Sequence, residues 1–345
     1  MNTPRPRLDP AVAEIRRSVR SLLERARADG TMASGDLVLV ALSGGPDSLA
    51  LAAATAFEAP KQDLRAGAVV VDHALQAGSE AVAGRASRQA AELGLDPVTV
   101  RRVTVGSDGG PEGAAREARH AALTEVAAAT GSPLVLLGHT LDDQAETVLL
   151  GLLRGSGPDS LSGMEPLTAR AAGPTYGRPL LGVRRHVTRQ ACAASGLVPW
   201  DDPQNTDPTY ARVRVRTALM PVLERELGAG VPEALARTAD QLREDAAALD
   251  HFAEEMAEDL AEHSEAGISL SVPELAANPP ALRQRLVRLA VEGEFGVTLS
   301  RTQTLEVCRL VTDWRGQGPI DLPGVRATRS GERVSFAARE PHPGG

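Results

Sequence analysis

The chain has 345 residues, of which 42% are hydrophobic, and a net charge of −8 at pH 7, values typical of a globular protein of two or three domains. Its two cysteines, Cys192 and Cys308, lie too far apart in sequence to form a local Cys-x-x-Cys redox or zinc motif. No apolar run is long enough to cross a membrane and the N-terminus carries no apolar leader, so we expect a cytoplasmic protein without a membrane partner.

Strands and helices alternate over the first half of the chain. An amphipathic helix is expected over residues 9–29, and strands are expected at 37–42, 68–72, 98–103 and 134–138, with helices between them. This alternation predicts an α/β fold with a doubly wound, mostly parallel sheet. Ligands of such sheets bind at the carboxyl ends of the strands.

The whole chain is expected to have three parts. These are an N-terminal helix within residues 1–33, an α/β domain over 34–216, and a mainly helical domain over 217–345 that has a small α/β end and is expected to contact tRNA. Residues 154–180 have the glycine and proline content of a loop. The helical pattern extends from 216 to 292, and the segment 318–338 alternates in the manner of short strands.

Residues 37–48 contain the most informative local pattern. They read Leu-Val-Leu-Val-Ala-Leu-Ser-Gly-Gly-Pro-Asp-Ser, which is a strand, the tight turn Ser43-Gly44-Gly45 and the start of a helix. Pro46 suits the first helical position, where its missing N–H costs nothing. Backbone N–H groups at a helix N-terminus attract phosphate, and glycines let the backbone approach it. The alternative is an ordinary βα turn capped by Ser43.

A second polar segment follows the strand at 134–138. It reads Gly-His-Thr-Leu-Asp-Asp-Gln-Ala-Glu-Thr and places three acids in the first turns of a helix. Asp142 and Glu146 are four residues apart and share a face, so their carboxylates could hold Mg²⁺ against phosphate oxygens. The alternative is a helix N-terminus that favours acidic residues for its dipole.

Charge is distributed unevenly along the chain. Residues 221–265 contain thirteen acidic residues and three arginines, whereas residues 178–216 contain seven arginines and three aspartates. A basic segment beside an acidic helical one is compatible with RNA binding, although arginine-rich faces are often only solvated.

Two of these segments resemble a known family. Ser-Gly-Gly-Pro-Asp-Ser resembles the SGGxDS signature of the PP-loop ATP pyrophosphatases, and residues 138–147 resemble the GHxxDDQxET block of the tRNA(Ile)-lysidine synthetases. The resemblance spans most of the chain, which is similar to a short form of that family. Further similar segments are 71–75, with Ala74 in place of the usual glycine; Glu112 with Arg116, Arg119 and His120; 154–164; 178–181; and 200–221, where Gln204 and Val213 depart from the family pattern.

The resemblance implies a carbon–nitrogen ligase that uses ATP. The C2 oxygen of the wobble cytidine in a tRNA(Ile) with a CAU anticodon attacks the α-phosphate of ATP, and diphosphate leaves. The ε-amine of L-lysine then attacks C2 of the adenylylated cytidine, AMP leaves, and lysidine is formed. The amine must lose a proton first, because the pKa of free lysine is about 10.4.

The resemblance also implies residue roles. ATP would be bound by Ala41, Ser43, Gly44, Gly45, Pro46, Asp47, Ser48, Val71 and Gly138. Mg²⁺ would be held by Asp47, Asp142 and Glu146. Catalysis would involve Asp47, Arg116, His139, Asp142 and Asp143, with Asp142 or Asp143 as the proton acceptor. The tRNA phosphates would be contacted by Arg178, Arg184, Arg185, Arg189, Arg212 and Arg216.

Three other functions are weighed against this one. A tRNA thiolase with the same loop usually needs paired cysteines or an iron–sulfur cluster, and the two cysteines here do not have that spacing. An amidotransferase-type synthetase would need a glutaminase domain, which is not visible. A non-catalytic adenine-nucleotide-binding module has no need for both the loop and the carboxylates. The sequence leaves open whether the protein is a homodimer.

Overall fold

The computed structural model describes residues 8–73, 78–103, 110–155, 157–170, 172–264 and 267–339. The chain forms two compact units, Met1–Gln241 and Leu242–Gly345. Their boundary falls inside helix α10 (Val231–Leu260), later in the chain than the boundary after residue 216 expected from the sequence. The first helix belongs to the first unit, because it packs against two other helices of that unit.

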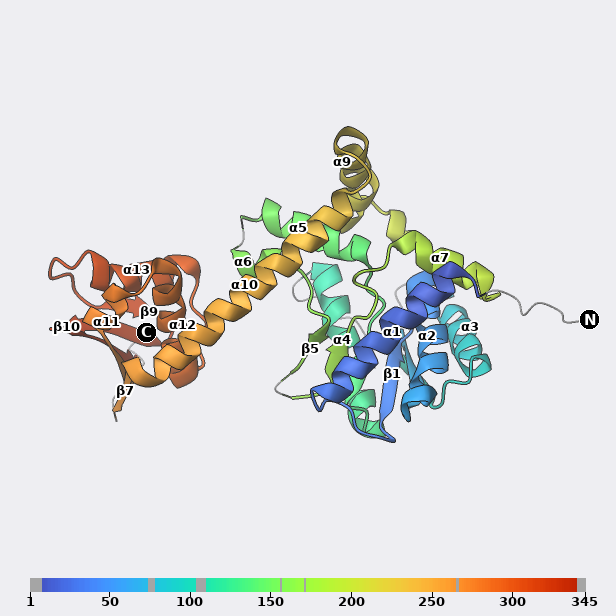
Figure 1. Ribbon diagram of the computed structural model, residues 1–345, viewed down its shortest axis with the longest axis horizontal. Helices are drawn as coiled ribbons and strands as arrows, with labels where there is room; N and C mark the ends of the chain where they lie inside the picture. Colours follow the sequence, from blue (N-terminus) through green and yellow to red (C-terminus); the bar gives the residue numbers. More distant parts are fainter. Residues whose placement is uncertain are drawn as a thin grey trace, which may run out of the picture. The chain divides into compact units, whose positions relative to one another are not determined.

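A six-stranded sheet forms the centre of the first unit (Figure 1). Its order is β3-β2-β1-β4-β6-β5; the neighbouring strands pair in parallel except β5 with β6, which are antiparallel. In the register of the central strands, Leu39 lies opposite Gly67 on one side and Val135 on the other. The strands are β1 (Leu37–Ala41), β2 (Arg65–Asp72), β3 (Val98–Arg102), β4 (Leu134–Leu136), β5 (Leu167–Thr168) and β6 (Thr175–Gly177).

Helices cover both faces of this sheet, as the alternation in the sequence predicts. Val38 and Val40 of β1 belong to a core shared with α1, α2, α3 and α7, whereas Leu37 and Leu39 face a second core that includes Leu123 of α4. The helices of the first unit that precede α10 are α1 (Pro10–Ala28), α2 (Pro46–Glu58), α3 (Ser79–Glu92), α4 (Gly110–Thr130), α5 (Leu141–Leu153), α6 (Pro158–Leu161), α7 (Arg185–Ala194), α8 (Ala211–Arg214) and α9 (Met220–Leu227), with short 3-10 or π turns at Ala59–Gln62, Pro203–Thr206 and Val215–Leu219.

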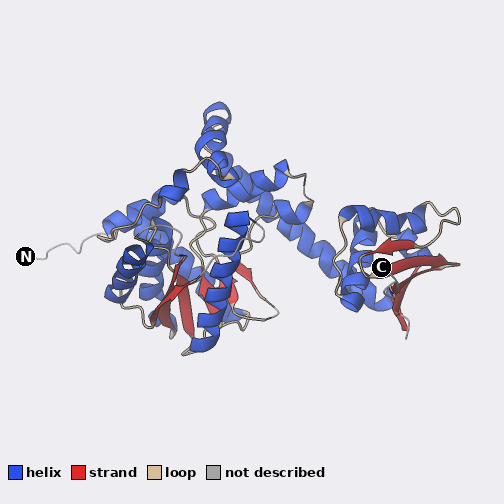
Figure 2. Cartoon of the chain, turned by 180° about the vertical axis from the view of Figure 1, so that it is seen from behind, coloured by secondary structure: helices blue, strands red, loops and turns tan. Residues whose placement is uncertain are grey.

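The second unit has its own sheet and its own core. Figure 2 shows its strands and helices, and the sheet order is β7-β8-β11-β10-β9 with antiparallel neighbours. Leu270, Leu286 and Phe336 are among its fully buried side chains. The elements are β7 (Ala261–Ser264), β8 (Gly267–Ser271), α11 (Val272–Ala277), α12 (Pro280–Phe295), α13 (Arg301–Thr312), β9 (Ile320–Leu322), β10 (Val325–Ser330) and β11 (Arg333–Ala338).

The region 216–292 is mainly helical, as expected, but the structure differs from the expectations in two segments. Residues 261–271, expected within a helical region, contain the paired strands β7 and β8; Gly267 has φ +132, and an added Cβ there would lie 2.2 Å from the Phe336 carbonyl oxygen. Residues 154–180, expected as a loop, contain α6, β5 and β6. β6 is only three residues long and is defined by its pairing with β4, so no periodicity could reveal it.

Within the residues that the structure describes, no helix is both long enough and apolar enough to span a bilayer.

Candidate active site at the carboxyl edge of the sheet

The turn between β1 and α2, residues 43–48, is a loop closed by its own side chains; we call it the phosphate loop. The Ser43 backbone N–H donates to Ser48 Oγ at 3.2 Å, and Ser48 Oγ lies 3.0 Å from the Gly45 carbonyl oxygen. Gly44 has φ +83, a conformation that favours glycine. The loop leads into the first turn of α2, whose backbone N–H groups have no acceptor within the helix. This geometry suits an anion.

Gly138, at the end of β4, lies directly against this loop. A Cβ added at Gly138 would be 3.1 Å from the Ser48 nitrogen and 3.2 Å from the Asp47 carbonyl carbon. These are backbone atoms at the start of α2, which cannot move without moving the loop. The glycine is therefore required by close packing between the two ends of the site.

Ala41 and Val71 lie at the carboxyl ends of the adjacent strands β1 and β2, and both are partly exposed. Residues 74–77 and 104–109, and the side chain of Glu112, lie outside the described residues. What the sequence suggests for those positions therefore stays a prediction.

Asp47, in the first turn of α2, points toward α7. Its carboxylate accepts a hydrogen bond from Thr188, and Arg185 Nε lies 3.8 Å from its Oδ2. Burial raises the pKa of Asp47 to about 6; the Thr188 hydrogen bond opposes this rise and the negative charge of Asp143 adds to it. Thr188 carries no sequence signal of its own, so the sequence reasoning missed it.

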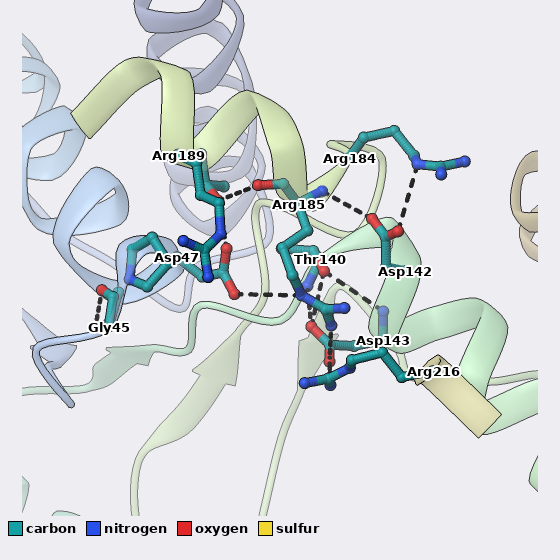
Figure 3. A network of polar contacts seen from close by, with 12 residues as sticks. Gly45, Asp47, Thr140, Asp142, Asp143, Arg184, Arg185, Arg189 and Arg216 are labelled. Carbon is teal, nitrogen blue, oxygen red and sulfur yellow. Dashed lines mark hydrogen bonds and ion pairs between the residues drawn. The ribbon is translucent and has the colours of Figure 1, made fainter. Parts of the chain in front are cut away.

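Carboxylates from α2 and α5 meet arginines from the segment 184–216 beside the phosphate loop (Figure 3). Arg185 is the centre of this group: its Nη2 lies 2.7 Å from Asp143 Oδ1, and its Nη1 lies 3.2 Å from Glu146 Oε1. Its backbone N–H donates to Asp142 Oδ2 at 2.7 Å. We call the group the acid–arginine cluster; its members are Asp47, Asp142, Asp143, Glu146, Arg184, Arg185, Arg212 and Arg216.

Asp143 and Glu146 are the buried acids of the cluster. Arg216 Nε donates to Glu146 Oε1 at 2.7 Å, and the Glu146 side chain is only 2% exposed. Asp143 Oδ2 accepts hydrogen bonds from the backbone N–H and the hydroxyl of Thr140 in a capping box. Burial opposes ionisation of Asp143, but the charge of Arg185 and the Thr140 hydrogen bonds outweigh it and lower its pKa to about 2.

The three acids predicted to bind Mg²⁺ do not form a ready-made metal site. Among the described residues, no three His, Cys, Asp or Glu side chains are placed to hold one ion. Glu146 is paired with Arg185, Arg212 and Arg216 through its carboxylate oxygens. The donor set in this structure therefore suits arginine more than a resident cation.

The six arginines predicted to contact RNA have protein partners. Arg184 lies 3.1 Å from Glu224 and 3.0 Å from Glu233, and Arg189 lies 2.8 Å from Asp201. Arg178 donates to the Glu165 carbonyl and to Thr168, both at 2.9 Å. Arg185, Arg212 and Arg216 are bound in the acid–arginine cluster. The structure brings four of the six together there and leaves Arg178 and Arg189 elsewhere.

A second group, the basic cluster, consists of Arg116, Arg119, Arg170 and Arg178. Burial lowers the pKa of Arg119, and the charges of Arg116 and Arg212 lower it further. Burial and the arginines of this cluster together lower the pKa of His120 to about 4. In the described part of the chain, Arg119 Nε and His120 Nδ1 are buried without a hydrogen-bond partner. A group of positive charges placed together in this way favours the binding of an anion.

Of this basic cluster, only Arg116 and Arg178 were assigned roles from the sequence; Arg119, with His120 beside it, was named only within a segment similar to the family. Arg119 and His120 follow Arg116 at helical spacing on α4, and that spacing is the signal that could have found them. His139, at the other end of the site, has a pKa lowered by burial to about 3, and its Nδ1 is buried without a partner among the described residues. We therefore expect a neutral His139 at pH 7.

The chain matches two family models. Residues 13–223 match the PP-loop domain, and residues 270–335 match the TilS substrate binding domain. The U34-tRNA thiolase NcsA from Methanococcus maripaludis has a similar fold, with a TM-score of 0.55 and 20% identity over 68% of this chain and 80% of that one. At that identity the likeness concerns the fold alone.

Curated relatives match nearly the whole chain. The tRNA(Ile)-lysidine synthase of Leifsonia xyli subsp. xyli is 61% identical over 88% of this chain and 91% of its own length. The tRNA(Ile)-lysidine synthase of Streptomyces coelicolor is 50% identical over 94% of this chain and 97% of its own length. With the phosphate loop and the acid–arginine cluster in place, these matches show that the chain belongs to the tRNA(Ile)-lysidine synthase family.

Proposed function

We propose that this protein joins L-lysine to C2 of the wobble cytidine in a tRNA(Ile) with a CAU anticodon and forms lysidine, AMP and diphosphate from ATP. The observation that carries the proposal is the acid–arginine cluster beside the phosphate loop, in a chain whose relatives are tRNA(Ile)-lysidine synthases. The three substrates are cytoplasmic, and we propose the same location for the enzyme.

The first step is adenylylation of the cytidine. The phosphate loop, Ser43 to Ser48, would bind the β- and γ-phosphates, with Ala41 and Val71 beside the nucleoside. Arg116 and the rest of the basic cluster would stabilise the charge on the α-phosphate. The C2 oxygen forms a bond to the α-phosphorus while the bond to diphosphate breaks. This step makes the oxygen a good leaving group.

Asp47 is the carboxylate within the phosphate loop itself, so we propose it as the ligand of a Mg²⁺ that arrives with ATP and would neutralise phosphate charge. Asp142 and Glu146 could join it only after their arginine partners move away.

The second step is attack by the lysine ε-amine on C2, with cleavage of the C2–O bond and release of AMP. Free lysine carries both charges, and the acid–arginine cluster offers both carboxylates and guanidinium groups to bind them. The low pKa of Asp143 makes it a weak proton acceptor. We therefore assign the proton to Asp142, whose side chain is 21% exposed. His139, neutral at pH 7, would orient the substrate.

One incubation tests the reaction. The full chain is mixed with ATP, Mg²⁺, lysine and an unmodified tRNA(Ile) transcript with a CAU anticodon, and the nucleosides are analysed by mass spectrometry. We expect cytidine to gain the mass of lysine minus water, only when ATP is present. Diphosphate release without the adduct would mean a different nucleophile. The absence of both, in a folded protein that binds ATP, would favour the non-catalytic module.

A pair of variants tests the role of Asp47. Asp47→Ala should abolish diphosphate release, whereas Asp245→Asn, at an exposed position of α10, should leave it unchanged. Release that survives in Asp47→Ala would contradict the assignment of Asp47.

A further inference from the structure

Residues 198–201 lie against the phosphate loop; we call this segment the strap. The Trp200 backbone N–H donates to the Gly44 carbonyl oxygen at 2.9 Å. A cavity of about 90 Å³ lies beside this contact and is lined by Gly44, by the strap and by residues of α3. The strap therefore touches the phosphate loop through the backbone atoms of Trp200 and Gly44, two residues that are 156 positions apart in the sequence.

The contact from Trp200 determines how one peptide of the loop is oriented. The Gly44 carbonyl and the Gly45 N–H belong to the same planar peptide and point in opposite directions. With the carbonyl held by Trp200, the Gly45 N–H is directed into the loop, where it lies 3.4 Å from Ser43 Oγ. A peptide held at both ends is preorganised for the phosphate that the loop receives.

The strap is held at Asp201 by an exposed ion pair with Arg189 of α7 and at Val198 by one side chain of α3. Gln89 Nε2 donates to the Val198 carbonyl oxygen at 3.2 Å, and the Val198 N–H donates to Gln89 Oε1 at 2.9 Å. Both backbone groups of Val198 thus bond to a single amide. The Val198 side chain is 70% exposed, so apolar burial of that residue does not anchor the strap.

We propose that Gln89 is a positioning residue for ATP. It holds Val198, Val198 keeps the strap in place, and Trp200 in the strap then fixes the peptide between Gly44 and Gly45. The inference rests on the proposed function only in placing the phosphates of ATP at this loop. Among the described residues, the Gln89 amide bonds to Val198 and not to the loop, so its effect passes through the strap.

The test is Gln89→Ala in the full chain, measured by tRNA-dependent diphosphate release. We expect the ATP KM to rise roughly thirtyfold, since two hydrogen bonds of about 1 kcal/mol each are removed, and kcat to stay within about twofold. Gln89→Glu keeps the oxygen that accepts from Val198 but loses the donor, so its ATP KM should be intermediate. In a Trp314→Phe background, Trp200 is the only tryptophan, and its ATP-dependent change in emission should require more ATP in Gln89→Ala.

The control is Arg88→Ala, at the adjacent exposed position of α3, which should leave the ATP KM unchanged. An unchanged ATP KM in Gln89→Ala would overturn the proposal. A loss of thermal stability and kcat without a change in ATP KM would also overturn it, because that result describes a purely structural role. Diphosphate release without lysidine in the wild type would contradict the proposed nucleophile alone, since the comparison of ATP KM values still applies.

Discussion

Asp47 and Asp143 are neighbouring carboxylates, one partly buried and one buried, with different proton affinities. Burial favours the protonated form of both carboxyl groups. In Asp47 the effect of burial exceeds that of the Thr188 hydrogen bond, so the pKa is about 6. In Asp143 it is outweighed by Arg185, whose Nη2 is 2.7 Å away, and by the two donors of Thr140, so the pKa is about 2. Two carboxylates whose pKa values differ in this way can take different roles at one pH.

His120 should make stability depend on pH. Its pKa falls from 6.5 to about 4 on folding, because burial and the neighbouring arginines disfavour its charged form. The resulting stability is present above pH 6.5 and is lost as the pH falls toward 4. His120→Gln should therefore show a smaller decrease in Tm than the wild type between about pH 7.5 and 5. The variant also loses the edge-on ring contact with Tyr176. That loss lowers its Tm equally at both pH values, so it does not affect the comparison of the two decreases in Tm. Parallel Tm curves would contradict the prediction.

Gly138→Ala should affect the phosphate loop. The new methyl group would press on the Ser48 nitrogen and the Asp47 backbone, at a cost of about 1–3 kcal/mol in unfolding free energy. The ATP KM should rise because the start of α2 is displaced. Gly182→Ala is the matched control, since a Cβ there meets no atom within 4 Å. Titrations of ATP and urea unfolding check both variants, and equal behaviour would refute the packing argument.

At the scale of elements, α7 is joined to the sheet domain by charge as well as by the apolar core that it shares with α1 and α2. Arg185, its first residue, is 18% exposed and pairs with Asp47, Asp143 and Glu146. Arg185→Met would leave two buried carboxylates with weakened compensation, so we expect a loss of about 3–5 kcal/mol in unfolding free energy.

Arg189→Ala on the same helix is the comparison for that variant. Its partner Asp201 is 71% exposed, so the loss should stay below about 1 kcal/mol. Urea unfolding measures both free energies. Similar losses in the two variants would show that burial of the acids does not matter.

A feature of these elements could be predicted when the residues that determine it lie close together in the sequence, and not when they lie far apart. The starts of α2 and α5 have local signals, and the sequence located both: Pro46 begins one helix, and Asp142 and Asp143 lie in the first turn of the other. The Thr140 capping box of α5 was not predicted. The partners of Arg184 could not be predicted, since Glu224 and Glu233 are 40 and 49 residues away. The pairing of Arg184 thus depends on the tertiary fold, and the contact of this arginine with tRNA stays a prediction.

At the scale of the whole molecule, the two units have separate cores. Leu286 is fully buried in the core of the second unit, and the cores of the sheet domain contain no residue after Leu235. Leu286→Ala should destabilise the second unit by about 2–5 kcal/mol. Hydrogen exchange should then increase within 242–345 while the ATP KM stays within about twofold. Faster exchange in β1 would indicate that the units unfold together.

Each unit also contains one buried thiol, Cys192 in the first and Cys308 in the second, and burial raises the pKa of each to about 11. At neutral pH neither thiol is appreciably ionised, so an alkylating reagent reacts only when the surrounding structure opens. Alkylation of each thiol therefore reports separately on the opening of the unit that contains it. The order in which mass spectrometry finds them alkylated would give the relative opening rates of the two units in the unmodified enzyme, without any engineered label.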